Sequence, residues 1–132
     1  MKWTGFILVL AMLGCAANHT ESSVQHVVIC WLKQPGDANG RQQLVDKARE
    51  LGRKIAGLEK VRAGDVLKST HPAVDASFDV GLVMTFKNQA ALDAYQENEI
   101  HKRAVKEVLL PLTSKVVIYD FTDASHTIAR GL

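Results

Sequence analysis

The chain has 132 residues, of which 47% are hydrophobic and 23% charged, and its formal net charge is +2. This length is sufficient for one small domain with a real core. Lysines and arginines are mixed with carboxylates, and no basic run carries interleaved aromatic residues, which argues against a nucleic-acid-binding protein.

Residues 1–14 have the pattern of a secretory signal peptide. Lys2 precedes the apolar run Gly5 to Gly14, which is too short to span a bilayer but has the length of a signal-peptide core. The run ends in Leu13-Gly14-Cys15-Ala16, which resembles a bacterial lipobox. This resemblance implies lipid attachment at Cys15, which would become the first residue of the mature chain.

Two departures from the lipobox leave an alternative open. Met12 stands where Leu is usual, and Leu13 stands where a small residue is commoner, so ordinary cleavage after Ala17 would instead give a soluble periplasmic or secreted protein. We expect an exported protein that is anchored by lipid at a bacterial cell membrane or outer membrane. Residues 15–23 then form the lipidated cysteine and a short polar tether.

The cysteine count argues against a structural disulfide. If Cys15 carries lipid, Cys30 has no partner. Cys30 lies in the apolar run His26 to Leu32, where a lone cysteine usually behaves as a small buried hydrophobe.

Strand and helix signals alternate from residue 24 onward. A β-branched run at residues 24–32 predicts a strand, closed by the turn residues Gln34-Pro35-Gly36. A helix is predicted over residues 40–55, with Asp37 or Asn39 as its N-cap and Gly57 after its end. Its apolar residues recur at spacings of four, three and four, which gives one stripe: Leu44, Ala48, Leu51 and Ile55.

The second half of the domain repeats this alternation. A weaker strand is predicted over residues 61–70 and a strong one over residues 78–86. Asn88 caps a helix that breaks at Asn98-Glu99, and a second helical segment over residues 100–110 stops before Pro111. A strand over residues 116–121 closes the domain, which we place at residues 24–122, and residues 123–132 form a polar tail.

The order β-α-β-β-α-β predicts an α+β fold of the ferredoxin-like type, with both helices on one face of an antiparallel sheet. The strongest strands are apolar on both faces, and two helices can cover only one face. The uncovered face predicts an interface, most economically with an identical chain. We therefore expect a homodimer built by sheet-to-sheet packing, which closes a barrel-like core.

Three segments resemble the stress-responsive α/β barrel (Dabb) family of dimeric ferredoxin-like proteins. They are QHVVICWL in the first strand, FDVGLVMTFKNQAALDAYQENEIH in the middle and KVVIYDF in the last strand. The resemblance covers about residues 25–122 and implies a dimeric α/β barrel. It also implies that the protein binds a small apolar molecule or acts in a stress response.

The resemblance also implies an alternative function as a cofactor-independent enzyme. In olivetolic acid cyclase, a plant member, the catalytic Tyr and His correspond to Tyr95 and His101, and a pocket His corresponds to His26. His101 would act as general base, and Tyr95 would donate a hydrogen bond to the enolate oxygen. Further ligand-binding residues expected on this basis are Val28, Val80 and Leu82.

Several residues depart from the pattern of that enzyme. Many members read His-Pro-x-His where this chain reads Asn98-Glu99-Ile100-His101, and a second pocket His of the cyclase corresponds to Val80. Tyr95 and His101 could therefore be ordinary packed side chains, and a haem-degrading monooxygenase is a third reading of the same fold. No cofactor or side-chain metal site is expected, because the histidines form no ligand spacing.

Overall fold

The computed structural model describes residues 21–124. Cys15, His19 and His126 lie outside the described residues, as do the predicted signal peptide, most of the tether and the end of the tail. Within the described range, no helix has the length and hydropathy needed to cross a membrane.

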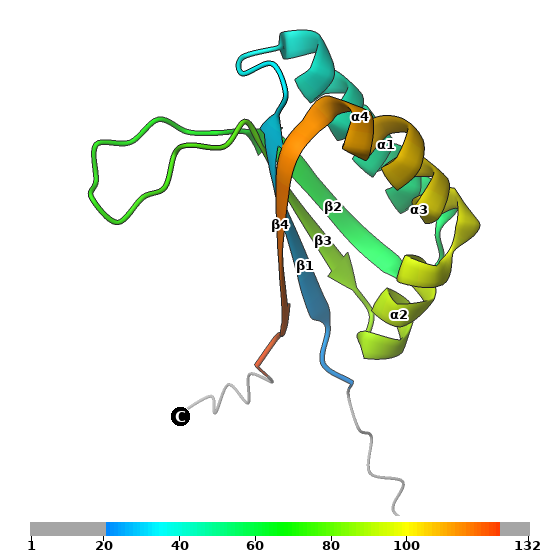
Figure 1. Ribbon diagram of the computed structural model, residues 1–132. Coiled ribbons are helices and arrows are strands. Elements are labelled where there is room, and N and C mark those ends of the chain that lie inside the picture. Colours follow the sequence, from blue (N-terminus) through cyan, green and yellow to red (C-terminus); the bar gives the residue numbers. More distant parts are fainter. Residues whose placement is uncertain (1–20, 125–132) are drawn as a thin grey trace, which may run out of the picture.

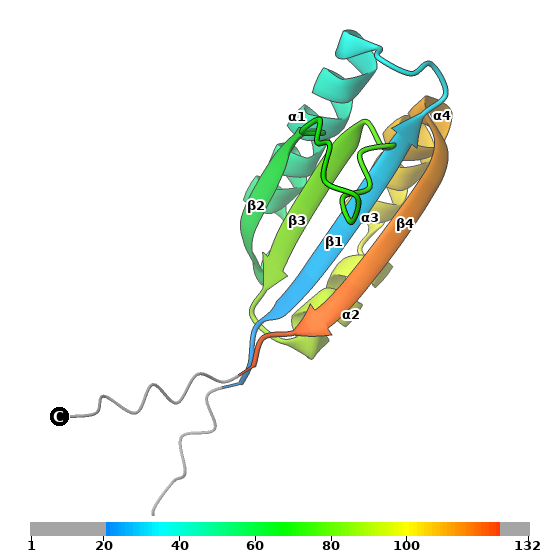
Figure 2. The same cartoon turned by 90° about the vertical axis from the view of Figure 1, so that its left-hand side faces the viewer.

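The sheet has four antiparallel strands in the order β2-β3-β1-β4. They span Val24–Leu32 (β1), Leu58–Asp65 (β2), Val80–Phe86 (β3) and Thr113–Thr122 (β4). All helices of residues 21–124 lie on one face of this sheet (Figure 1), and none of them lies on the other face (Figure 2). The predicted ferredoxin-like fold is thereby confirmed.

Helix α1, Ala38–Lys54, forms as its sequence predicts. The side chain of Asp37 caps it by accepting a hydrogen bond from the backbone N–H of Asn39. The predicted stripe Leu44, Ala48, Leu51 and Ile55 is buried against the sheet. Gly57 follows with a φ of 85°, a left-handed conformation that suits glycine, and turns the chain directly into β2.

Strand β2 lies earlier than predicted, at Leu58–Asp65 rather than residues 61–70. The reason is its pairing with β3, which runs from Leu58 opposite Phe86 to Asp65 opposite Val80. Beyond Asp65 the chain has no strand to pair with, and it leaves the sheet. The same limit makes β3 begin at Val80, two residues later than expected.

The second helical region consists of four short pieces. They are α2 (Gln89–Glu97), α3 (Glu99–Ala104), the π-helix η1 (Val105–Leu109) and α4 (Leu110–Leu112). Asn88 caps α2 as predicted, and Asn98 caps α3 at the predicted break. Contrary to expectation, the helical path does not stop before Pro111. The N–H of Leu110 donates to the carbonyl of Val105, and Pro111 lies in the first turn of α4, where it needs no donor.

The core lies between the helices and the inner face of the sheet. Alternate residues of β1 and β3 are buried there. Four of them are at most 1% exposed: Val24, Cys30, Val80 and Phe86. Cys30 is a free, buried thiol whose pKa is raised to about 11 by burial. It therefore behaves as the predicted hydrophobe, since a thiol at neutral pH is a poor nucleophile.

The outer face of the sheet is also apolar. Its residues alternate with the core residues of β1, β3 and β4, and they are Val27, Ile29, Trp31, Val83, Val117, Tyr119 and Phe121. Tyr119 and Phe121 are 60% and 52% exposed. No helix from residues 21–124 lies on this surface, called the outer face below, and the segment between β2 and β3 stands in front of part of it (Figure 2).

Candidate functional site

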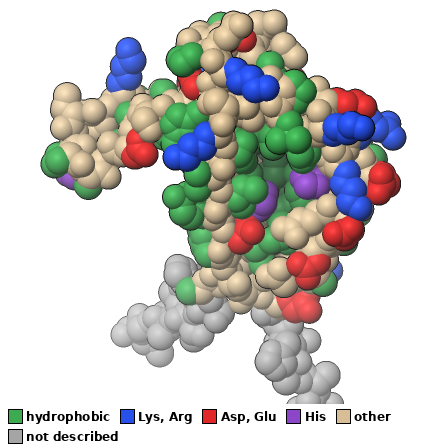
Figure 3. All heavy atoms as spheres, viewed as in Figure 1, with side chains coloured by type: hydrophobic (Ala, Val, Ile, Leu, Met, Phe, Trp, Pro, Cys, Tyr) green, Lys and Arg blue, Asp and Glu red, His purple; other side chains and the backbone are tan. Residues whose placement is uncertain are grey.

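A cavity of about 300 Å³ lies between the inner face of the sheet and the helices. Its wall residues come from β1, β3, β4, α1, α2, α3 and η1, whereas β2 and α4 supply none. Figure 3 shows histidine side chains in a hollow bordered by hydrophobic ones, at the side where β4 approaches the helices. The wall residues are His26, Val28, Leu44, Lys47, Ala48, Leu51, Leu82, Met84, Tyr95, Gln96, His101, Ala104, Val105, Val108, Leu109 and Ile118.

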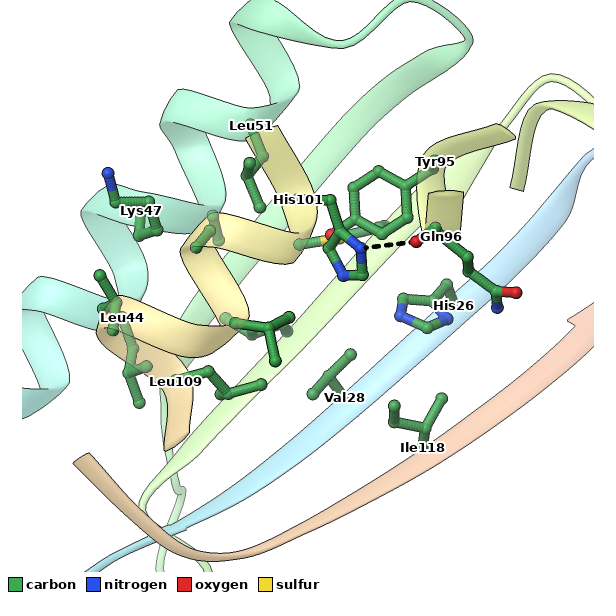
Figure 4. Close-up of a pocket in the computed structure, with 16 residues that line it drawn as sticks. His26, Val28, Leu44, Lys47, Leu51, Tyr95, Gln96, His101, Leu109 and Ile118 are labelled. Carbon is green, nitrogen blue, oxygen red and sulfur yellow. Dashed lines mark hydrogen bonds between the residues drawn. The ribbon is translucent and has the colours of Figure 1, made fainter. Parts of the chain in front are cut away.

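The polar groups of this cavity gather on one side. In Figure 4, His26, Tyr95, Gln96 and His101 lie together, and Leu44 and Leu109 line the other side. Lys47 contributes its hydrocarbon stem, because its ammonium group donates to Glu50 at 2.5 Å and points away from the cavity. The site thus has an apolar body and one hydrogen-bonding end.

His26 lies on β1 and is bonded to Asp120 on the neighbouring strand β4. The two residues are directly opposite in the antiparallel register, so their side chains share the inner face. The distance from Nδ1 of His26 to Oδ1 of Asp120 is 2.5 Å, and the His26 side chain is 6% exposed. A carboxylate only accepts hydrogen bonds, so Nδ1 carries a proton, and in the neutral form of this ring Nε2 is the acceptor.

Tyr95 lies on α2 and is 2% exposed. Its hydroxyl donates to Sδ of Met84 at 3.5 Å, and its ring packs against the rings of Phe86 and His26, with centroids 4.9 and 6.1 Å away. Burial raises the pKa of this phenol. Tyr95 is therefore a neutral hydrogen-bond donor, held by a weak sulfur acceptor that a ligand oxygen would displace.

His101 lies at the start of α3 and is half-buried. Its ring stacks on Tyr95 with a centroid distance of 4.1 Å and an interplanar angle of 36°, and its Nδ1 lies 3.4 Å from the carbonyl oxygen of Gln96. Burial lowers the pKa of His101, and the nearby ammonium group of Lys102 acts in the same direction. The ring is therefore neutral at pH 7 and can accept a proton.

The predicted site residues His26, Val28, Leu82, Tyr95 and His101 all line this one cavity. Val80 does not line it, because that side chain is fully buried in the core at the start of β3, opposite Cys30 on β1. Asp120 was not predicted. The signal that would have revealed it is the β1–β4 register, which a sequence pattern does not fix.

The helix that carries His101 continues into η1, which supplies Val105, Val108 and Leu109 to the wall. A π-turn is wider than an α-turn, and such turns are frequent at functional sites. Its presence here was not foreseeable from the apolar spacing. No group of three or more metal-ligating side chains occurs within residues 21–124.

Comparison with known families gives one match. Residues 24–123 match the Dabb family, described as Stress responsive A/B Barrel Domain. No curated protein is similar enough in sequence to match the chain.

Solved structures share the fold at low identity. A Dabb family protein with a ferredoxin-like fold from Mesorhizobium loti is 21% identical, covers 79% of this chain and 99% of its own, and has a TM-score of 0.63. A dimeric protein of unknown function from Bacteroides fragilis is 17% identical over 80% and 100%, with a TM-score of 0.62. Hydroxynitrile lyase from Passiflora edulis is 16% identical over 80% and 96%, with a TM-score of 0.69.

Proposed function

Because the chain belongs to the Dabb family of stress-responsive A/B barrel domains, we propose that it is a dimeric binding module for a small apolar molecule with one polar group. The observation that supports this function is the cavity itself, where apolar walls enclose about 300 Å³ and His26, Tyr95 and His101 meet at one end. Such a combination is typical of small-molecule sites.

The cavity size sets the class of ligand. At about 300 Å³ the cavity is at the lower end of the range of small-molecule sites, which indicates a ligand smaller than most drug-sized molecules. Its polar group would accept a hydrogen bond from Tyr95 or donate one to Nε2 of His26. We use 1-naphthol as a probe, because it is apolar, fluorescent, of this size and carries one hydroxyl group.

Binding is tested by titrating the purified domain with 1-naphthol and with naphthalene. Saturable binding of the naphthol, with naphthalene about fivefold to tenfold weaker, would support a polar end worth about 1 kcal/mol. If neither compound saturates, or if the two bind equally, the proposed division of the cavity into an apolar body and a polar end is wrong.

The dimer of this proposal uses the outer face of the sheet. Its support is the uncovered apolar surface that includes Val83, Val117 and Tyr119. Proteins of the same fold from Bacteroides fragilis and Thermobifida fusca are described as dimeric.

Export and a lipid anchor at Cys15 complete the proposed setting. Their support is the charged start, the short apolar run and the Leu13-Gly14-Cys15-Ala16 end of the sequence. Mass spectrometry of the mature protein from its native host tests this. A lipid mass on Cys15 is expected, and an N-terminus at Asn18 would remove the anchor while leaving export in place.

A second candidate function is acid–base catalysis in the same cavity, as in the cyclase-type reaction considered above. The specific support is that two histidines and a neutral phenol line the cavity, and that Asp120 is bonded to one of the histidines. His101 would take a proton from an acidic carbon beside a carbonyl group, and Tyr95 would donate a hydrogen bond to the enolate oxygen that forms. His26 is the competing base, since Asp120 would stabilise its protonated ring.

This candidate is tested by deuterium exchange at the carbon between the two carbonyls of 1-phenylbutane-1,3-dione. Acceleration over buffer that falls about a hundredfold or more in His101→Ala would identify His101 as the base. A comparable loss confined to His26→Ala would assign that role to His26 instead. An exchange rate equal to that in buffer would leave binding as the function.

A further inference from the structure

The segment between β2 and β3, residues 66–79, leaves the sheet as an arm, called the β2–β3 arm here. Figure 1 shows it projecting from one end of the sheet to the side opposite the helices. Figure 2, which views the outer face, shows the arm standing in front of that face. The arm and the uncovered apolar surface are therefore on the same side of the molecule.

The base of the arm is fixed to β1. The backbone N–H of Asp79 donates to the carbonyl of Cys30 at 2.9 Å, and the Asp79 carboxylate accepts from the backbone N–H of Leu32 and of Gly36 at 2.9 and 3.2 Å. Phe78 packs edge-on against Trp31, with ring centroids 6.4 Å apart. These contacts set the direction in which the arm leaves the sheet.

The outer part of the arm is shaped by its own hydrogen bonds. Ser69 accepts from the N–H of His71, the N–H of Val74 donates to the carbonyl of His71, and Asp75 accepts from the N–H of Ser77. Two apolar side chains nevertheless remain in solvent, because Leu67 is 83% exposed and Val74 is 47% exposed. Because the arm lies on the same side of the molecule as the apolar outer face, a molecule that covers that face could also cover these two side chains.

We infer that the β2–β3 arm of one copy crosses the dimer interface and packs Leu67 and Val74 against the second copy. This inference rests on the proposed dimer. The arm projects from the end of the sheet on the same side as the outer face (Figures 1 and 2). A second copy that covers the outer face would therefore lie beside the arm. A two-fold axis makes the contact reciprocal, so each copy gives one arm and receives the other.

Because the arm contact occurs twice in a two-fold dimer, substitutions in the arm should have a large effect on dimer affinity. Every substitution in the arm removes two contacts from a dimer, one at each end of the two-fold relationship. Replacing Leu67 and Val74 together by serine should therefore raise the dimer dissociation constant by roughly a hundredfold or more. The monomer should stay folded, because these two side chains are exposed in the single copy.

The test uses the mature chain and sedimentation over a concentration series. Leu67→Ser/Val74→Ser is compared with Lys68→Gln/Ala73→Ser, which changes two exposed residues of the same arm without removing large apolar groups. In parallel, a benzophenone amino acid at Val74 is photoactivated in the purified protein, and the cross-linked peptides are identified by mass spectrometry.

The expected result is a weaker dimer for the serine pair, an unchanged dimer for the control pair, and cross-links between two copies. A dimer of unchanged affinity in the serine pair, or cross-links confined to the arm's own chain, would overturn the arm contact while the dimer itself stands. A mature chain that is monomeric at every concentration would overturn the proposed dimer, and the arm contact with it.

Discussion

His26 and Asp120 are cross-strand neighbours on β1 and β4, and their side chains meet at 2.5 Å on the inner face of the sheet. This contact joins a buried ring to a carboxylate that is 40% exposed. It holds the His26 ring at the polar end of the cavity and fixes which ring nitrogen carries the proton. Asp120 thus orients a side chain of the cavity wall, although it does not line the cavity itself.

Removing the carboxylate should therefore destabilise the fold. Asp120→Ala leaves the buried Nδ1–H of His26 without its acceptor, which should lower the free energy of unfolding by about 1–3 kcal/mol. Asp120→Asn retains an acceptor oxygen and should lose less. Urea unfolding measures both values, and long-range proton–nitrogen NMR reports the ring tautomer.

The matched control is Asp93→Ala, which removes a carboxylate that accepts from Gln89 on an exposed helix surface. Its cost should stay within about 0.5 kcal/mol. Equal losses for Asp93→Ala and Asp120→Ala would show that the contact with His26 adds nothing.

His101 makes stability depend on pH. Burial lowers its pKa in the folded state, so the unfolded chain binds more protons between that lowered pKa and the ordinary histidine value of about 6.5. The free energy of unfolding should therefore rise with pH through this window and gain nothing more from His101 above it. His101→Phe keeps a ring against Tyr95 and removes the titration.

The measurement is urea unfolding of the parent chain and His101→Phe from pH 5 to pH 7.5. The difference between the two stability curves isolates His101 from the other titrating groups. A parallel pair of curves would contradict the lowered pKa.

The outer face should tolerate no charge at its centre. Val117 lies opposite Ile29, and Val117→Asp would place an unpaired carboxylate in the proposed interface. Removing that charge from water costs several kcal/mol, so the dimer should weaken at least a hundredfold. Ala90→Asp on the exposed surface of α2 is the control and should not affect association.

Sedimentation equilibrium of the three chains gives the dissociation constants. Equal dimer affinities for Val117→Asp and the parent chain would place the interface elsewhere. A parent chain that sediments as a monomer would remove the proposed dimer altogether.

The order of elements could be predicted from sequence because hydrophobic periodicity is local. The stripe from Leu44 to Ile55 and the caps Asp37 and Asn88 each involve residues within a few positions of one another, and the structure confirms them. The end of β2 could not be predicted in this way. It is set by the length over which β3 pairs with it, which is a property of two segments.

In the candidate site, too, features that depend on nearby residues could be predicted, and those that depend on two distant segments could not. Tyr95 and His101 could be singled out because they lie close together in the sequence and resemble a known pair. Asp120 could not, because its significance comes from the register with His26 across β1 and β4. Val80 was assigned to the pocket from resemblance alone, and its side chain lies in the core instead. Val80 shares the inner face with Leu82 but lies at the start of β3, and how far a cavity extends along a strand depends on packing that a short motif does not encode.

The central claim is that the cavity between α1, α3 and the sheet binds the ligand, and filling the cavity tests it most directly. Ala104 lines the cavity and is 8% exposed, whereas Ala90 is an exposed alanine on α2. Ala104→Leu adds bulk inside the cavity, and Ala90→Leu adds the same atoms to the surface. Titration with 1-naphthol should show binding lost or weakened at least tenfold in Ala104→Leu and unchanged in Ala90→Leu, with both variants folded by circular dichroism. Equal affinity in Ala104→Leu and the parent chain would contradict binding in this cavity.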